Sequence, residues 1–166
     1  MLKKLALAAA AVAMGAVAAH AATATGTFTV QATILPSCTI DTLPNYNFGN
    51  IGGTTSLIRN LTPTTVQITC SNGTGYGITL SSANAAGGGG TGFNMVNGAD
   101  LLGYRLYANS FGNPQWDGTA GGTFSGSGTG SATAISMYGE IPIQTPPVGG
   151  WPNVTYTDVV TMTITY

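Results

Sequence analysis

The chain has 166 residues, of which 43% are hydrophobic and only 5% charged. Beyond residue 21 it contains two arginines and five carboxylates. A chain with no basic face is not expected to bind nucleic acid or an anionic membrane. No histidine or lysine remains beyond residue 21, so we predict no catalytic residue, no cofactor, no metal site and no small-molecule substrate.

Residues 1–21 have the three parts of a secretory signal peptide. Two lysines precede an apolar run from Leu5 to Val17, and Ala19-His20-Ala21 fits the small-residue pattern of a cleavage site. A membrane anchor is the alternative, but the run is short against the roughly 20 residues that a spanning helix needs. We therefore expect cleavage before Ala22 and secretion of one domain.

Residues 26–35 alternate between apolar and polar side chains for longer than a typical strand. Because successive side chains of a strand point to opposite faces, one face is apolar or small and the other is polar. The first face carries Gly26, Phe28, Val30, Ala32 and Ile34. A strand of this kind needs a sheet to pair with. Two interpretations remain at this point. The segment is an ordinary edge strand of the chain's own sheet, or it pairs with the sheet of a neighbouring molecule.

Cys38 and Cys70 are the only cysteines, and an even count behind a secretory signal predicts one structural disulfide. Closing a loop of this size stabilises the fold by roughly 3 to 4 kcal/mol in the chain-entropy model. A reactive or metal-binding thiol pair is the alternative, but neither a CxxC spacing nor a histidine accompanies the two cysteines.

Further short strands follow, separated by turn residues. Residues 64–70 and 76–80 alternate on either side of Asn72-Gly73, which predicts a hairpin. Three more strands are expected in residues 102–107, 133–143 and 154–166. The last of them carries Tyr156, Val160, Met162, Ile164 and Tyr166 on one face. No 3.6-residue period is sustained after the signal, so the pattern favours an all-β antiparallel sandwich.

Two stretches, residues 83–92 and 118–131, are rich in Gly, Ser and Thr and are predicted to be loops. A phosphate-binding loop is the alternative for the first, but it lacks the lysine of a P-loop. We expect the two loops, including the run Gly87 to Gly90, to stay mobile or to make weak contacts between neighbouring subunits.

Four carboxylates were considered as acid–base groups. Asp100, Asp117 and Glu140 belong to no recognisable motif and are expected to be solvated. Asp158 lies on the apolar face of the last strand and is expected to accept a bond from a turn or strand-end amide. Trp116 and Trp151 support an alternative function, a lectin-like carbohydrate-binding face.

Six motifs in this order resemble one family. They are Phe28-x-Val30 leading into Ser37-Cys38-Thr39, Asn47-Phe48-Gly49, Val66-x-Ile68-x-Cys70, Leu102-x-Tyr104-x-Leu106-Tyr107, Tyr138-Gly139-x-Ile141-Pro142, and Tyr156-x-Asp158-x-Val160-x-Met162-x-Ile164-x-Tyr166. Together they are similar to the spore coat protein U domain family and, within it, to subunits of archaic chaperone-usher pili of the Csu type.

The resemblance implies an incomplete immunoglobulin-like β-sandwich that a donor strand from a neighbouring subunit completes. It divides the chain into a signal peptide (residues 1–21), a donor strand (22–35) and a pilin domain (36–166). Identical or homologous pilins, a periplasmic chaperone and an outer-membrane usher are the implied partners, and a homopolymer on the cell surface, serving adhesion and biofilm formation, is the implied product. The last strand, from Tyr156 to Tyr166, is expected to line the acceptor groove and to face the chaperone. A secreted coat or matrix protein is the remaining alternative.

Overall fold

The computed structural model describes residues 21–52, 56–84, 92–111, 115–116, 122–147 and 149–166. Ile34–Tyr166 form one compact unit, and the residues up to Thr33 belong to a separate unit. The predicted signal peptide, apart from its last residue, and the run Gly87 to Gly90 lie outside the described residues. No helix in the described part of the chain is long and apolar enough to cross a membrane.

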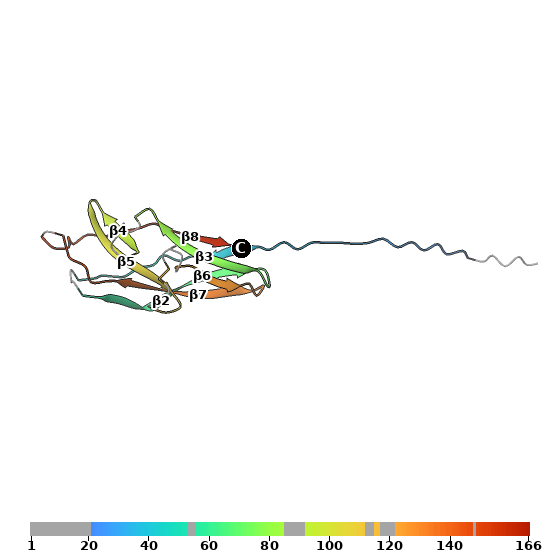
Figure 1. Cartoon of the computed structure of the whole chain (residues 1–166), viewed down its shortest axis with the longest axis horizontal. Coiled ribbons are helices and arrows are strands. Elements are labelled where there is room, and N and C mark those ends of the chain that lie inside the picture. The colour runs from blue at the N-terminus through green and yellow to red at the C-terminus, as the bar shows by residue number, and fades with distance from the viewer. Residues whose placement is uncertain (1–20, 53–55, 85–91, 112–114, 117–121, 148) are drawn as a thin grey trace, which may run out of the picture. The chain divides into compact units, whose positions relative to one another are not determined.

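The larger unit is built from antiparallel strands in two sheets (Figure 1). The first sheet has the order β1-β2-β7-β5-β4 and the second has the order β6-β3-β8. The strands are β1 (Cys38–Thr42), β2 (Ile58–Cys70), β3 (Gly75–Ser82), β4 (Phe93–Asn97), β5 (Asp100–Ala108), β6 (Phe124–Ser127), β7 (Ala132–Ile141) and β8 (Val160–Thr165). The predicted all-β sandwich is confirmed.

The core lies between the sheets and includes the side chains that the alternation placed on one face of residues 64–70 and of residues 76–80. Val66 and Ile68 of β2, Ile78 of β3 and Ile135 of β7 are completely buried. Fully burying a side chain of this size contributes roughly 1.5 to 3 kcal/mol. The predicted inward faces of β2 and β3 are therefore confirmed.

The predicted disulfide joins the first two strands. Cys38 lies opposite Cys70 in the β1–β2 register, and the two form the disulfide. The pairing continues one residue further, because the Ser71 N–H donates to the Ser37 carbonyl at 2.9 Å and the Ser37 N–H donates to the Ser71 hydroxyl at 3.1 Å.

The predicted hairpin between residues 64–70 and 76–80 is wrong. A turn does form, because the Thr74 N–H donates to the Ser71 carbonyl and Gly73 has a φ of 78°. This turn carries the chain from β2 in one sheet to β3 in the other. Gly128 exchanges backbone bonds with Gly73 and Thr74 at 2.9 and 2.7 Å and so occupies the groups that a hairpin would use. Both strands still turn their apolar faces to the core.

The stretch predicted as a loop at residues 118–131 contains a strand. β6 pairs with β3 from Gly75↔Ser127 to Ile78↔Phe124. Gly126 permits this contact, because a Cβ at that position would lie 2.6 Å or less from the Tyr76 ring and hydroxyl. The glycine at this position allows the close contact within the sheet and does not end the strand.

Residues 22–33 form no strand. Phe28 and Val30, which the alternation placed on an apolar face, are 88% and 82% exposed. Exposed apolar side chains that alternate along a segment indicate a surface that another sheet is meant to cover.

Residues 43–48, which follow β1, pack on β7 at a glycine. A Cβ at Gly139 would lie 2.5 Å from Tyr46 Cε1 and 2.8 Å from Phe48 Cε1. The two rings contact edge to face at 5.1 Å, and Phe48 meets Tyr104 at 5.8 Å. The absence of a side chain at residue 139 therefore positions the segment that follows β1.

We predict that Gly139→Ala lowers the free energy of unfolding by about 1 to 3 kcal/mol, because the added methyl group forces both rings to move. Chemical denaturation measures this change. Gly75→Ala is the matched control, since its Cβ meets no atom within 4 Å. Equal loss of stability in the two variants would contradict the packing described.

Candidate functional site

β8 is paired on one edge. It bonds to β3 from Gly77↔Thr165 to Ser82↔Val160 and is the last strand of its sheet. Within the described residues no strand pairs with its other edge. An unpaired edge presents a row of backbone N–H and C=O groups that can bond to an added strand.

The side chains of β8 alternate as predicted. Val160, Met162 and Ile164 turn toward the core, whereas the three threonines between and after them are exposed. Val160 and Met162 line a cavity, and Ile164 packs against the core beside it. Tyr166 lies beyond the end of the strand and is exposed, so of the predicted groove residues it contributes least.

An open groove of about 480 Å³ runs beside the inward face of β8. One wall is formed by residues 43–48, and the other by residues 155–158 together with Val160 and Met162. Its floor consists of core side chains from both sheets, namely Leu80, Leu106 and Met137. The groove therefore reaches down to the hydrophobic core.

The predicted last strand, residues 154–166, is interrupted. Thr157 pairs with Val96 of β4, where the Val96 N–H donates to the Thr157 carbonyl at 2.8 Å and the Thr157 N–H donates back at 3.1 Å. After Asp158 the chain enters β8 in the other sheet. Tyr156 thus precedes β8, although its side chain still lines the groove. The alternation stays in phase across the break, so the sequence does not reveal it.

Asp158 fixes the point at which the chain changes sheets. Its Oδ1 accepts from the Val159 N–H at 2.8 Å, which confirms the predicted bond to a strand-end amide. The same oxygen accepts from the Ser82 hydroxyl at 2.8 Å and the Asn84 side-chain amide at 3.0 Å. Oδ2 accepts from the Tyr104 hydroxyl at 2.6 Å. Sequence patterns did not indicate these last three partners, because they lie far from Asp158 in the chain.

Tyr104 is a neutral donor in this network. Burial raises the pKa of the Tyr104 hydroxyl far above its ordinary value, and the Asp158 carboxylate raises it further. The hydroxyl therefore keeps its proton at physiological pH and continues to donate to Asp158. This bond ties β5, at the bottom of the groove, to the start of β8.

Glu140 is not a solvated carboxylate, so that prediction is wrong. It is 3% exposed and lies opposite both Arg59 and Arg105 in the registers of β7 with β2 and β5. Arg59 Nε lies 2.7 Å from Oε2, and one guanidinium nitrogen of Arg105 lies 3.2 Å from Oε1. Alternation of apolar and polar residues predicts which face of a strand a side chain lies on, but not which strand is its neighbour. It therefore does not predict that these three charged side chains meet. Asp117 lies outside the described residues.

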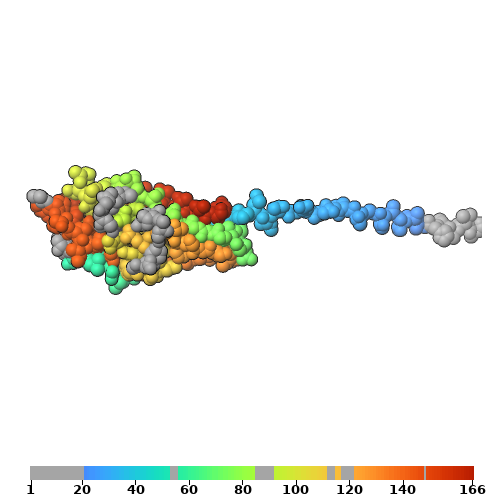
Figure 2. Space-filling view, viewed as in Figure 1, coloured from blue at the N-terminus to red at the C-terminus, as the bar shows by residue number. Residues whose placement is uncertain are grey.

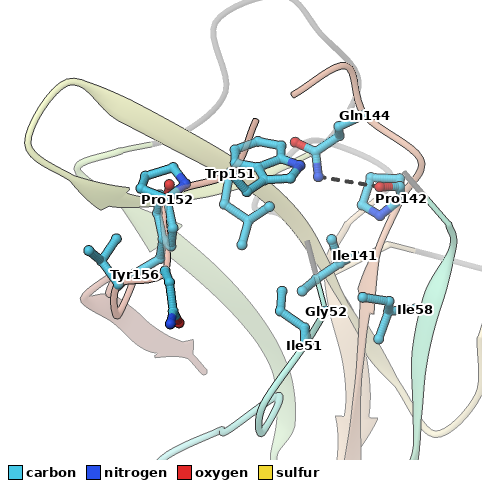
Figure 3. Close-up of a pocket in the computed structure, with 12 residues that line it drawn as sticks. Ile51, Gly52, Ile58, Ile141, Pro142, Gln144, Trp151, Pro152 and Tyr156 are labelled. Carbon is cyan, nitrogen blue, oxygen red and sulfur yellow. Dashed lines mark hydrogen bonds between the residues drawn. The ribbon is translucent and has the colours of Figure 1, made fainter. Parts of the chain in front are cut away.

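A second cavity of about 290 Å³ lies beyond Tyr156, which lines both spaces. Figure 3 shows Trp151 and Gln144 on one side of it and Ile51 and Ile58 on the other. Trp151 meets Tyr156 edge to face at 6.1 Å. The other tryptophan of the suggested carbohydrate-binding face is a core residue, because Trp116 is buried and its Nε1–H donates to the Ile78 carbonyl at 2.9 Å.

The profile of the spore coat protein U domain matches residues 24–163, which is most of the chain. The chain belongs to the spore coat protein U domain family. The matched range of this domain begins ahead of β1 and includes the segment that carries Phe28 and Val30. The resemblance that the motifs suggested is therefore confirmed. No curated protein matches the chain.

The chain is similar to a solved structure from Acinetobacter baumannii. That structure is the CsuC-CsuE chaperone-tip adhesion subunit pre-assembly complex from archaic chaperone-usher Csu pili. The identity is 20% and the TM-score 0.54, over 81% of this chain and 41% of that chain. This domain thus spans about two fifths of the length of that chain. The likeness confirms the immunoglobulin-like sandwich fold.

We predict that Tyr104→Phe destabilises the domain by about 1.5 to 3 kcal/mol, because it removes a donor from a charged acceptor next to the groove. Urea unfolding followed by tyrosine and tryptophan fluorescence measures the loss. The matched control is Tyr138→Phe, a partly exposed tyrosine of β7 whose hydroxyl has no hydrogen-bond partner among the described residues. A Tyr104→Phe variant as stable as this control would contradict the role assigned to the bond.

Proposed function

We propose that this domain is a structural subunit of a surface fibre assembled by the chaperone-usher pathway, and that the groove beside β8 receives a strand from another subunit. The observation that carries the proposal is the combination of an unpaired β8 edge with a groove that core side chains line. An added strand would bond to the backbone of β8 and cover that floor in one step.

The strand to be received is residues 22–35 of a neighbouring subunit. Its inward face would consist of Gly26, Phe28, Val30, Ala32 and Ile34. Burying Phe28, Val30 and Ile34 completely would contribute roughly 1.5 to 3 kcal/mol each, before any backbone pairing. The inclusion of residues 24–33 in the family match supports the view that this segment acts together with the sandwich.

A periplasmic chaperone is the proposed partner of the subunit before assembly. The solved complex of similar fold holds a chaperone with a tip adhesion subunit, which supports this proposal. Until assembly, the unpaired edge of β8 and the exposed side chains Phe28 and Val30 need protection, and a chain with so few charges has little electrostatic repulsion to keep it from aggregating. We extend the proposal to an outer-membrane usher, a homopolymer and a role of the fibre in adhesion and biofilm formation.

The proposed path of the chain follows from its predicted parts. Residues 1–21 direct it into the periplasm and are removed, residues 22–35 become the donor strand, and residues 36–166 form the acceptor domain. The subunit then reaches the cell surface as part of the fibre. The proposal assigns no enzymatic activity to the domain.

We predict that Val30→Asp prevents fibre formation, whereas Thr29→Asp permits it. The first carboxylate would enter the apolar groove unpaired, at a cost of several kcal/mol, while the second would face solvent from the opposite side of the same strand. Electron microscopy of cells that co-express each variant with the chaperone and usher measures assembly.

The two variants differ by one position, so they control for the added charge. Equal capture of both by the chaperone establishes that each subunit folds and is exported. The proposed function is contradicted if both variants form fibres as the unmodified chain does, or if Thr29→Asp fails as completely as Val30→Asp.

A further inference from the structure

We propose that Met95, Met137 and Met162 form a site of reversible oxidation in the groove beside β8, and that conversion of their thioethers to sulfoxides stops the groove from receiving a strand. The reagent is a small two-electron oxidant of the hypohalous acid or peroxide class. This inference rests on the proposed function and adds to it a means by which assembly is regulated.

All the methionines beyond residue 21 line this one groove. The chain has five methionines, of which Met1 and Met14 lie in the predicted signal peptide. The other three line the groove and come from three different strands, Met95 from β4, Met137 from β7 and Met162 from β8. The flexible, polarizable thioethers are thus concentrated where the proposed strand would bind.

The rest of the chain offers few side chains that compete for such an oxidant. Beyond residue 21 it contains neither lysine nor histidine. Its two cysteines are joined in the Cys38–Cys70 disulfide, so no free thiol is present. The thioether of methionine is therefore the side-chain group that the oxidant attacks most readily.

The groove lets an oxidant of a few atoms reach the three sulfurs. The groove is open and has a volume of about 480 Å³. Figure 2 shows residues of β8, in red, at the surface of the sandwich. Met95 is half-buried, whereas Met137 and Met162 are 5% and 8% exposed. We therefore expect Met95 to be oxidised first and the other two more slowly.

The reaction is a two-electron oxygen transfer. In the net reaction with hypochlorous acid, the methionine sulfur loses two electrons and gains an S–O bond, the O–Cl bond breaks, and chloride and a proton leave. With hydrogen peroxide the O–O bond breaks and water leaves. A methionine sulfoxide reductase, with a dithiol as the reductant, returns the sulfoxide to the thioether.

The oxidised side chains oppose insertion of a strand, because each sulfoxide adds a polar oxygen to the groove. Leu80 and Leu106 line the groove together with the methionines. Tyr104 lines it too, but its hydroxyl already donates to the Asp158 carboxylate. The apolar face of an inserted strand would bury the new oxygens without a hydrogen-bond donor. We expect the affinity for the strand to fall about ten- to a hundredfold.

A filled groove protects the same three sulfurs. An inserted strand would cover the side chains that line the groove, so the oxidant would no longer reach the thioethers. The modification therefore acts on a subunit that awaits its strand and spares a subunit that has received one.

The test treats the full chain, released from its proposed chaperone, with hypochlorous acid and then quenches the reaction with free methionine. Mass spectrometry of proteolytic fragments measures oxidation at each methionine. Fluorescence anisotropy then measures binding of a labelled peptide of residues 22–34. Met95→Leu/Met137→Leu/Met162→Leu is the matched variant, because leucine has a similar volume and no thioether.

We expect oxidation to weaken peptide binding by the unmodified chain about ten- to a hundredfold and to leave binding by the leucine variant unchanged. Methionine sulfoxide reductases are expected to restore binding to the oxidised chain, a result that depends on no variant. Peptide added before the oxidant is expected to slow oxidation of all three methionines.

Unchanged peptide binding after the three methionines are oxidised would overturn the inference and leave the proposed function intact. An equal loss of binding in the leucine variant would also overturn it, because other side chains would then be responsible. Methionines that stay unoxidised in the empty groove, or reductases that fail to restore binding, would overturn it as well. Failure of the unoxidised chain to bind the peptide would instead contradict the proposed function.

Discussion

The structure depends on a hydrophobic core that is open along one edge. Met162 of β8 is nearly buried between the sheets, yet the same strand has no partner on its outer edge among the described residues. One extended strand with an apolar face would bond to the backbone groups on that edge and also cover the core side chains that line the groove. Residues 26–34 have this pattern and are the segment that the proposed assembly supplies.

The polar contacts of the domain hold the frame of this groove. Asp158 fastens the start of β8 to β3 and β5, and Gly139 lets the aromatic residues of the opposite wall lie against β7. Glu140 and its two arginines hold β2, β7 and β5 in register. Glu140, its two arginines and Asp158 therefore act mainly to hold strands in place.

Alternation was sufficient to predict which side chains face the core, because a strand exposes opposite faces at successive residues whatever its neighbours are. It could not predict the partners of a strand. Residues 64–70 and 76–80 have the same pattern in a hairpin and in two separate sheets, and residues 154–166 keep their phase while changing sheets at Asp158. Glu140 was misassigned for the same reason, since its arginines lie on strands distant in the sequence. The groove was expected only through the family resemblance.

The most direct test of the central claim is hydrogen exchange of a subunit that lacks residues 22–34, released from its chaperone with and without a peptide of those residues. The account predicts that the peptide protects the amides on the outer edge of β8 and shields the segment at residues 43–48. Protection at β4 or β6, two other outer strands of the sheets, or no change at β8, would contradict the claim that this groove receives the strand.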